Sequence, residues 1–357
     1  MKPFVESSDI LMDGAALDRR MARDGYLFLK GFIPREVITD LRHQFMGIVA
    51  EAGWLKPGTS VDDAVVKPEA ACTDPDPRCL EVLKRQYVLE DFHALFHRPE
   101  VMGLFERMFG EPVLKHPECL IRVIFPKQFN FENTTGPHQD FPHVQGTAEC
   151  FTFWLPLGDC PIEMGPVAVA PGTHKEGVRE FRLCSDGGGL QVTDPMVGQW
   201  VVSDYEIGDA LIFHSLVVHR ALPNLTDRLR QSIDVRYQRL SEPTLKKNLG
   251  TYTGFCTWEE VYAGWKSKEL QYYWKKLDVK TVPWDWQYYD KRAELAFAAA
   301  EEGDEEARVA LLRIYQQDED AGRRAEAARC LDLLDEKNGV KGAERVGWSE
   351  QLNVFAG

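Results

Sequence analysis

The chain has 357 residues, of which 44% are hydrophobic and 27% are charged, a balance typical of a globular protein with a sizeable core. Its formal net charge of −14 argues against non-specific binding to nucleic acid or to an anionic membrane. The N-terminus lacks a hydrophobic signal core, no apolar run is long enough to span a membrane, and the eight cysteines form no Cys-x-x-Cys pair. We therefore expect a cytoplasmic protein with reduced thiols.

The first segment, residues 1–110, is predicted to be a helical cover. Apolar spacing and the positions of Pro and Gly indicate helices near 13–24, 34–53, 78–97 and 99–109, with a short buried strand at Tyr26–Leu29. His93 and His97 lie four residues apart and can share one face of the third helix. No carboxylate or third ligand accompanies them at the spacing of a metal site, so we interpret both as packing or surface residues.

Short apolar strands separated by turns follow between residues 111 and 240. The candidate strands are Cys119–Phe125, Cys150–Pro156, Pro166–Ala170, Gln199–Ser203, Ala210–His214, Val217–Arg220 and Gln231–Arg239. Strands without long intervening helices favour an antiparallel sandwich or barrel. In such a fold, two strands that are distant in the chain can bring their side chains together at one end.

A His-x-Asp motif in this segment is the first candidate for chemistry. If the run Gly136–His143 is extended, His138 and Asp140 point to the same face. One imidazole and one carboxylate make half of a metal site, and His219 is the best candidate for the remaining ligand. Two histidines and one carboxylate, with open coordination positions, suit a non-haem Fe(II) oxygenase. The alternative interpretation of an isolated His-x-Asp is a turn that the aspartate caps.

An ordered series of further motifs resembles the phytanoyl-CoA dioxygenase family of Fe(II)/2-oxoglutarate oxygenases. The resemblance implies a mainly β fold with a helical cover (α+β), built on a double-stranded β-helix, or jelly roll, that N-terminal helices surround. Two positions depart from the family pattern, because Met164 stands where Asn is usual and Ala221 where a small hydroxyl residue is common. The series lies within residues 20–240 and runs in the family's order: Asp24-Gly25-Tyr26, Gly31-Phe32-Ile33-Pro34, His138-Gln139-Asp140, Trp154-Leu155-Pro156-Leu157, Glu163-Met164-Gly165-Pro166, Pro171-Gly172-Thr173-His174, Gly208-Asp209, His219, Asn224, Arg230 and Ser232.

The resemblance implies that His138, Asp140 and His219 bind Fe(II), and that 2-oxoglutarate and O2 are co-substrates. Related halogenases have a small residue at the position of Asp140, so halogenation is not expected. His174 and His214 are interpreted as non-ligands. His174 ends a Pro-Gly turn that is structural in the family, and His214 precedes His219 by five residues, which places the two on opposite faces of a continuous strand.

An arginine is the expected partner of the distal carboxylate of 2-oxoglutarate, because a guanidinium can bind a carboxylate through two hydrogen bonds. Family position implies Arg230, with Arg228 as the rival. Strand alternation places both on one face with Ser232 and cannot separate them. Ser232 and Trp154 are predicted to lie beside the co-substrate, with plain core packing as the alternative for Trp154. Gln128 is predicted to donate a hydrogen bond to 2-oxoglutarate.

Two segments follow the core. Residues 241–290 are rich in tryptophan and tyrosine, and residues 291–357 are rich in alanine, glutamate and arginine. We expect the aromatic segment to pack as a cover or lid; a surface that stacks carbohydrate rings or bases is the alternative. We expect the last segment to form a helical hairpin interrupted at Gly303-Asp304. It is a candidate lid, partner-docking module or homo-oligomer contact.

The leading hypothesis is an enzyme that oxidises, most simply by hydroxylation, a small organic molecule of specialised metabolism, with release of succinate and CO2. Phe141 and His143 are predicted substrate contacts, with a structural role as the alternative for His143. The same oxidant can serve desaturation, cyclisation or epoxidation.

A zinc hydrolase is disfavoured because the motif lacks the helical spacing of zinc ligands. The alternative from another class is a non-catalytic protein that binds a partner through its helical tail.

Overall fold

The computed structural model describes residues 1–357 except 74–75, 130–133, 185–189, 195, 197, 253–255, 286, 319, 341–347 and 350–357. The end of the predicted C-terminal segment therefore lies outside the described residues. Contacts within the chain define two compact units. The larger comprises Met1–Thr134, Gln139–Val178 and Met196–Trp284, and the smaller comprises Thr135–His138, Arg179–Pro195 and Asp285–Gly357.

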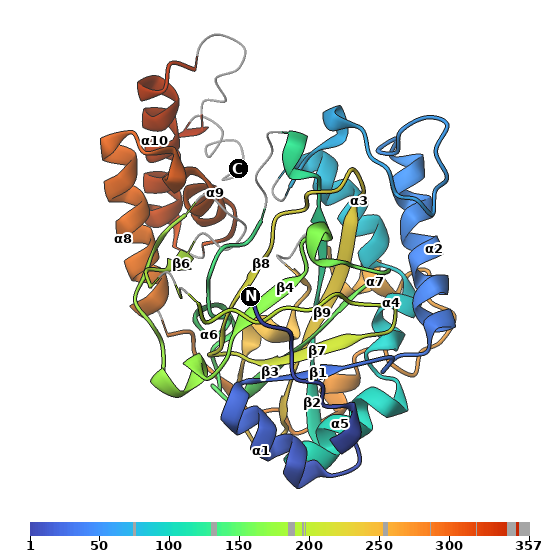
Figure 1. Ribbon diagram of the computed structural model, residues 1–357. Helices are drawn as coiled ribbons and strands as arrows, with labels where there is room; N and C mark the ends of the chain where they lie inside the picture. Colours follow the sequence, from blue (N-terminus) through green and yellow to red (C-terminus); the bar gives the residue numbers. More distant parts are fainter. Residues whose placement is uncertain are drawn as a thin grey trace. The chain divides into compact units, whose positions relative to one another are not determined.

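A five-stranded antiparallel sheet is the frame of the larger unit (Figure 1). Strands that are distant in the chain are neighbours in this sheet, so that Trp154 pairs with Leu211 on one side and Asp234 on the other. The sheet confirms the expected antiparallel architecture, whereas the double-stranded β-helix remains a prediction. The strand order is β1 (Tyr26–Leu29), β7 (Ala210–His214), β3 (Cys150–Pro156), β9 (Arg230–Arg239) and β2 (Val113–Ile124).

Two shorter strand pairs also belong to the larger unit. β4 (Val167–Ala170) pairs antiparallel with β8 (Val218–Ala221), and β10 (Thr244–Leu245) pairs parallel with β11 (Thr281–Val282). The predicted strand Gln199–Ser203 is wrong. Within the described chain, Val201 forms isolated bridges with Lys2 and Val169 instead. The backbone of Val201 exchanges two hydrogen bonds with Val169, so the chain crosses β4 at one residue and does not run along it.

Alternation of side chains gives the main sheet two different faces. Successive residues of a strand point to opposite sides. In β9 the odd-numbered residues Ile233, Val235 and Tyr237 enter the main hydrophobic core. The even-numbered residues are polar, yet they are also buried, and they occupy the opposite face: Arg230, Ser232, Asp234 and Arg236. In β9, one side therefore packs into the main core and the other carries buried charged groups, whereas on β1 and β7 the side opposite the main core is apolar and forms a second hydrophobic cluster.

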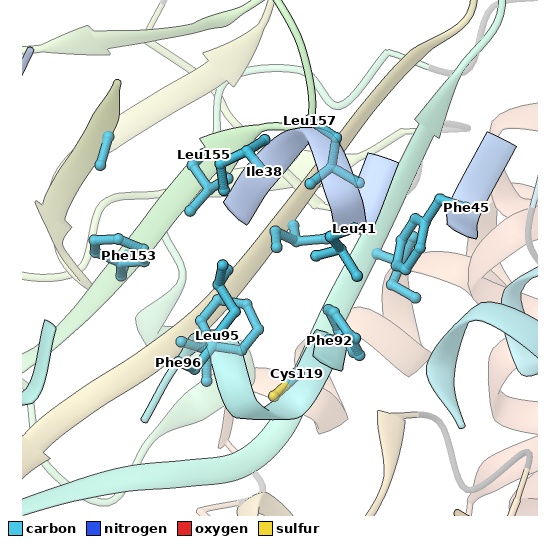
Figure 2. Packing of buried hydrophobic residues seen from close by; sticks show 14 of the residues in the cluster. Ile38, Leu41, Phe45, Phe92, Leu95, Phe96, Cys119, Phe153, Leu155 and Leu157 are labelled. Atoms are coloured by element: carbon cyan, nitrogen blue, oxygen red, sulfur yellow. The ribbon is translucent and has the colours of Figure 1, made fainter. Parts of the chain in front are cut away.

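Helices cover the apolar face of the sheet. Figure 2 shows side chains of α2 and α4 gathered with Phe153 and Leu155 of β3. The rings of Phe96 and Phe153 meet edge to face at 6.4 Å between centroids. Burying one such side chain contributes about 1.5–3 kcal/mol to folding. The helices concerned are α2 (Arg35–Glu51), α3 (Pro77–Tyr87), α4 (Glu90–Leu95) and α5 (Pro99–Phe109).

The helix predicted over residues 78–97 is in fact two helices, α3 and α4. The chain becomes extended at Leu89, with φ −69° and ψ 128°. This break redirects α4 so that the ring of Phe92 meets both Tyr87 and Phe45, at 5.7 and 5.8 Å between centroids. Tertiary packing therefore outweighs the continuous helical pattern of the sequence at this point.

The first helix, α1 (Gly14–Asp24), begins and ends with standard capping signals. The carboxylate of Asp13 accepts a hydrogen bond from the amide of Ala16, and Gly25 ends the helix at φ +80°. A Cβ atom on Gly25 would lie 2.6 Å from Nδ1 of His174. Glycine is therefore required here both for the backbone conformation and for the close approach of a neighbouring side chain.

The aromatic-rich segment after β9 contains α7 (Trp258–Tyr262), whose rings pack against one another and against the main core. Trp258 stacks on Tyr262 at 5.4 Å and contacts Trp274 at 4.8 Å between centroids. Trp265 lies 5.2 Å from the ring of His93 on α4. These three tryptophans are thus partly or fully withdrawn from water.

The smaller unit has a hydrophobic core of its own, built mainly from alanine and leucine side chains. The expected hairpin is wrong, because the described residues form three helices. Gly303 at φ +81° ends the first, and an ion pair of 2.8 Å joins Arg308 of the second to Asp335 of the third. The elements are the antiparallel strands β5 (Phe181–Leu183) and β6 (Leu190–Val192), with α8 (Gln287–Glu302), α9 (Arg308–Gln317) and α10 (Ala321–Lys337).

Across the described chain, no helix has the length and apolar character needed to cross a membrane.

Two buried histidines in the larger unit make stability depend on pH. Burial lowers the pKa of His93 to about 3 and that of His116 to about 4, both from an ordinary value near 6.5. Each ring N–H is used in the core. His93 donates to the carbonyl of Tyr87 and His116 to the side-chain oxygen of Gln238, both at 2.7 Å. The folded state therefore holds both rings neutral.

We predict that the free energy of unfolding falls as the pH is lowered from about 6.5 towards 4. Between these pH values the two histidines bind protons in the unfolded chain but stay neutral in the folded chain. Each of them lowers the free energy of unfolding by up to about 1.4 kcal/mol for each pH unit. Urea unfolding at several pH values measures the slope. His93→Gln should reduce it, while replacement of the exposed His43 should leave it unchanged. An unchanged slope in His93→Gln would contradict the assignment.

Candidate metal centre and active site

Three buried side chains with metal-binding atoms meet in the structure: His138, Asp140 and His219. One ligand atom from each lies within 4.8 Å of those of the other two. The Oδ1 atom of Asp140 is 3.7 Å from Nε2 of His219. The structure thus brings together the three residues that the sequence predicts as metal ligands. His219 is supplied by β8, and the other two come from the turn that precedes α6 (Phe141–Val144).

Both imidazoles are oriented by the backbone in the same way. The Nδ1–H group of His138 donates to the carbonyl of Gly136 at 2.8 Å, and that of His219 donates to the carbonyl of Val217 at 3.1 Å. Each acceptor lies two residues before its histidine. A proton held on Nδ1 leaves the lone pair on Nε2, which is the form of histidine that coordinates a metal.

The carboxylate of Asp140 is held by two donors from the polar face of the main sheet. Its Oδ2 atom accepts a hydrogen bond of 2.6 Å from the hydroxyl of Thr152 and one of 3.1 Å from the guanidinium of Arg236. Thr152 on β3 and Arg236 on β9 are directly paired across the sheet. The two donors therefore reach the same oxygen because of strand register, and Oδ1 is the oxygen turned towards His219.

Arg236 in turn belongs to a chain of ion pairs along the sheet. Its guanidinium lies 3.0 Å from Asp234, and the same carboxylate lies 3.5 Å from Arg122 on β2. Burial alone would lower the pKa of Arg236, but Asp140 and Asp234 outweigh burial and raise it. Arg236 therefore stays charged, and its charge balances the buried carboxylate of Asp140.

The backbone at Asp140 corrects the expectation of an extended run. Asp140 has helical dihedral angles, φ −70° and ψ −30°, and its carbonyl accepts from the amides of His143 and Val144. Its side chain makes no capping hydrogen bond to this short helix, so the alternative of a capping aspartate does not apply. A turn, and not strand alternation, places the carboxylate beside the imidazole.

Gln139, between the two ligands, ties their turn to the strand that carries the third. Its side-chain amide donates to the carbonyls of Leu216 at 2.6 Å and Gly177 at 2.9 Å. The amide of Phe141 donates to the carbonyl of Ser215. Ser215 and Leu216 lie between β7 and β8, so these bonds hold the end of β8, and hence His219, close to Asp140.

A second buried cation lies further along the polar face. Arg230 is 3% exposed, and its Nη1 donates to the hydroxyl of Ser232 at 2.5 Å. The indole N–H of Trp154 donates to the same hydroxyl at 3.1 Å, and the guanidinium lies 5.8 Å from the ring centroid. Among the described residues, no carboxylate lies within 4.0 Å of Arg230. Burial lowers the pKa of Arg230 to about 10, so the group is still charged at neutral pH.

The other predicted contacts of the co-substrate lie elsewhere. Arg228 is exposed and precedes β9, which begins at Arg230, so it does not share the buried position of Arg230. Gln128 is also exposed, and its amide donates to the carbonyl of Thr226 at 3.5 Å. The structure therefore separates the two arginines, which alternation alone could not do.

The remaining predicted residues divide into two pairs. Phe141 and His143 are half-buried in α6, directly after Asp140. The Nε2–H group of His174 donates to the carbonyl of Ala22 at 3.1 Å, and His214 lies 3.5 Å from Glu149. Neither of these last two histidines belongs to the cluster of metal-binding atoms found in the described chain.

Four residues of this site are absent from the sequence-based prediction: Thr152, Asp234, Arg236 and Arg122. A signal for two of them was present, because polar residues alternate along the predicted strand Gln231–Arg239. Such alternation on a strand whose other face is apolar indicates a polar face. The sequence gives no indication that this face is buried, or that its register aligns Thr152 with Arg236.

The donor set fits iron. Two neutral imidazoles and one carboxylate, grouped on one side and buried, form the set that non-haem Fe(II) oxygenases use. The backbone acceptors of both Nδ1–H groups and the two donors to Asp140 supply the supporting contacts that such ligands need. The site thereby defines the class of protein as a non-haem oxygenase.

A family match and two relatives support this class. The sequence matches the phytanoyl-CoA dioxygenase (PhyH) family over residues 21–232. The 1-deoxypentalenic acid 11-beta-hydroxylase of Streptomyces exfoliatus is 30% identical over 257 residues, which are 68% of this chain and 87% of the relative. The Streptomyces arenae protein of the same name is 29% identical over 251 residues, 67% of this chain and 86% of that protein. A solved structure of the epimerase SnoN in complex with Fe3+, alpha ketoglutarate and nogalamycin RO is 20% identical, with a TM-score of 0.48 over 65% of this chain and 86% of that one.

The chain belongs to the phytanoyl-CoA dioxygenase family. It is an Fe(II)/2-oxoglutarate-dependent oxygenase, with Fe(II) as its metal and 2-oxoglutarate and O2 as co-substrates. The resemblance found in the sequence is thereby confirmed.

We predict that Thr152→Val weakens metal binding. Valine has nearly the same shape but cannot donate to Asp140, so the carboxylate loses one of the contacts that orient it. Removing a partner of a metal ligand typically lowers affinity about 10- to 100-fold. Anaerobic titration with Fe(II), or with Co(II) as a spectroscopic probe, measures the change.

Thr147→Val is the matched control, because Thr147 is also buried but its hydroxyl accepts from the amide of Glu149. Equal affinities in Thr152→Val and wild type would show that Asp140 stays oriented without the threonine hydroxyl.

Proposed function

We propose that the protein hydroxylates a small organic molecule and releases succinate and CO2. The observation that carries the proposal is the combination of a buried two-histidine, one-carboxylate cluster with a buried arginine that has no carboxylate within 4.0 Å among the described residues. Thr152 contacts Asp140, and Trp154, two residues further along β3, shares Ser232 with Arg230. The metal cluster and the cation are thus linked through neighbouring residues of two paired strands.

The chain's own groups have distinct tasks in this reaction. His138, Asp140 and His219 would hold Fe(II), which together with 2-oxoglutarate and O2 supplies the power to insert oxygen into a C–H bond. Arg230 binds the distal carboxylate of 2-oxoglutarate through charge-assisted hydrogen bonds, with Ser232 beside it. Thr152 and Arg236 keep Asp140 in its ligand orientation. The buried sheet face excludes water, which strengthens each of these electrostatic contacts.

Hydroxylation is preferred over the other outcomes because two relatives, each matched over most of its length, are named hydroxylases. The substrate in their name, 1-deoxypentalenic acid, makes small organic acids the first class for a substrate screen. Desaturation, cyclisation and epoxidation use the same oxidant and differ in the product. Product analysis by mass spectrometry separates hydroxylation, which adds one oxygen atom, from desaturation, which removes two hydrogen atoms.

The first test is decarboxylation of 2-oxoglutarate in the absence of substrate. We expect slow release of succinate by the wild type, lost in His138→Ala and Asp140→Ala because the metal is no longer held. His174→Ala is the control, since His174 lies outside the cluster and should keep the activity. Ligand-deleted variants that decarboxylate as well as the wild type would refute the site. A folded protein that binds Zn but neither Fe(II) nor 2-oxoglutarate would favour a hydrolase or a non-catalytic binding protein.

The second test distinguishes Arg230 from Arg228. Arg230→Met should raise the 2-oxoglutarate concentration needed for half-maximal activity far more than Arg228→Met, because only Arg230 is buried. Loss of a buried charge-assisted partner costs roughly 2–5 kcal/mol of binding free energy. The visible charge-transfer band of the anaerobic Fe(II)/2-oxoglutarate complex reports binding without turnover. A larger effect in Arg228→Met would transfer the role to that residue.

The helices α8, α9 and α10 remain our candidate for a homo-oligomer contact. Sedimentation velocity of the full chain, compared with a variant carrying charge reversals on the exposed sides of these helices, tests this. A wild type that sediments as a monomer at all concentrations would rule it out.

A further inference from the structure

A buried lysine and a buried cysteine meet on the helix-covered face of the main sheet. The Nζ atom of Lys115 lies 3.0 Å from Sγ of Cys119, and the residues are 1% and 0% exposed. Both lie in β2, where the register with β9 shifts: Lys115 pairs with Tyr237 and Cys119 with Val235. This bulge shortens the path between them, since four residues of a regular strand span about 13 Å.

Lys115 is an unusual residue for this position. No carboxylate lies within 4.0 Å of its amine in the described parts of the chain. The amine is instead surrounded by aromatic rings, with the centroids of Phe96 at 5.5 Å and Tyr273 at 5.6 Å. A lysine is rarely buried without a counter-ion, because an unpaired ammonium loses its hydration without compensation. Burial lowers the pKa of Lys115 accordingly, which favours the neutral, nucleophilic amine.

The thiol is turned so that its sulfur faces this amine. The S–H group of Cys119 donates to the carbonyl of Pro117 at 3.4 Å, and the amine of Lys115 donates to the sulfur. Nitrogen and sulfur are therefore in direct contact, inside a core that holds both in place. Such a pair needs little movement to become covalently joined.

We propose that Lys115 and Cys119 form a modification site at which dioxygen joins the amine nitrogen to the thiol sulfur through one bridging oxygen atom. The amine loses one hydrogen atom and the thiol loses its own. One atom of O2 becomes the bridge, and the other leaves as water with these two hydrogens. Nitrogen and sulfur are oxidised and O2 is reduced. O2 is already a co-substrate of this enzyme and is small enough to enter a packed core.

The link has two physical consequences. It keeps the nitrogen uncharged in the core, because a nitrogen bonded to oxygen is a far weaker base than an alkyl amine. It also closes the bulge of β2 covalently, which restricts the unfolded chain. A thiol reductant returns the amine and the thiol and releases the bridging oxygen as water, while the reductant's own thiols are oxidised to disulfides. The modification is therefore reversible, in contrast to sulfinic or sulfonic acids of cysteine.

The experiment compares the full-length protein exposed to air with protein purified anaerobically in reductant. We expect the air-exposed protein to gain the mass of one oxygen atom less two hydrogen atoms and, when denatured, to titrate one thiol fewer than the reduced protein. A glutamate-specific protease that cuts after Glu118 separates Lys115 from Cys119 in the chain. The two peptides should then stay joined in the air-exposed sample and come apart after reduction.

Lys115→Met and Cys119→Ala should each abolish the mass gain. Cys256→Ala should retain it, because among the described residues the amine of Lys84, which interacts with Cys256, donates to Glu260 and not to the sulfur. The wild-type comparison stands even if a core variant folds poorly. Three results overturn the proposal: no mass change in air, oxygen added to Cys119 alone, or loss of two hydrogens without oxygen, which denotes a direct sulfur–nitrogen bond.

Discussion

The site depends on one constraint, which is that a buried carboxylate must be both charged and correctly turned. Asp140 satisfies it by accepting from Thr152 and Arg236 through a single oxygen, Oδ2. Desolvation of a lone carboxylate would be strongly unfavourable, and a freely rotating one would be a poor ligand. Thr152 and Arg236, which pair across two strands, meet both requirements. The positive charge of Arg236 offsets the desolvation of the carboxylate, and the two hydrogen bonds fix the direction of Oδ1. The ion pairs through Asp234 to Arg122 extend this balance from β9 to β2.

The two faces of the main sheet have different roles in the protein. One face is covered by aromatic and aliphatic side chains from the helices, which supply most of the packing energy. On the opposite face, β9 carries buried polar residues at alternate positions, whereas β1 and β7 carry apolar residues such as Phe28 and Phe213, which form a second hydrophobic cluster. Because rigid packing on one face holds the strand register, it also determines which polar residues meet on the other. The stability of the core and the geometry of the metal centre therefore rest on the same strand pairings.

Arg230 and Lys115 are both buried basic residues with no carboxylate within 4.0 Å among the described residues, yet their surroundings give them different roles. Arg230 lies beside a hydroxyl and an indole N–H on the polar face, where an anionic co-substrate can supply the missing charge. Lys115 lies among aromatic rings on the packed face, where no anion can enter and its contact is a thiol. The lack of a carboxylate partner among the described residues thus points to ligand binding at Arg230 and to covalent chemistry at Lys115.

The sequence by itself determined the chemistry of the site and the family of the protein. His138, Asp140 and His219 are identified by residue type and by the order of motifs, because these groups are chosen for what they bind, and the same order predicts Arg230 as the partner of the co-substrate. Only the tertiary structure decided how they are held. The helical turn at Asp140, the burial that separates Arg230 from Arg228, and the register that aligns Thr152 with Arg236 all arise from contacts between distant segments. A local pattern shows which faces a strand has, but not which neighbour each face meets or whether water reaches it.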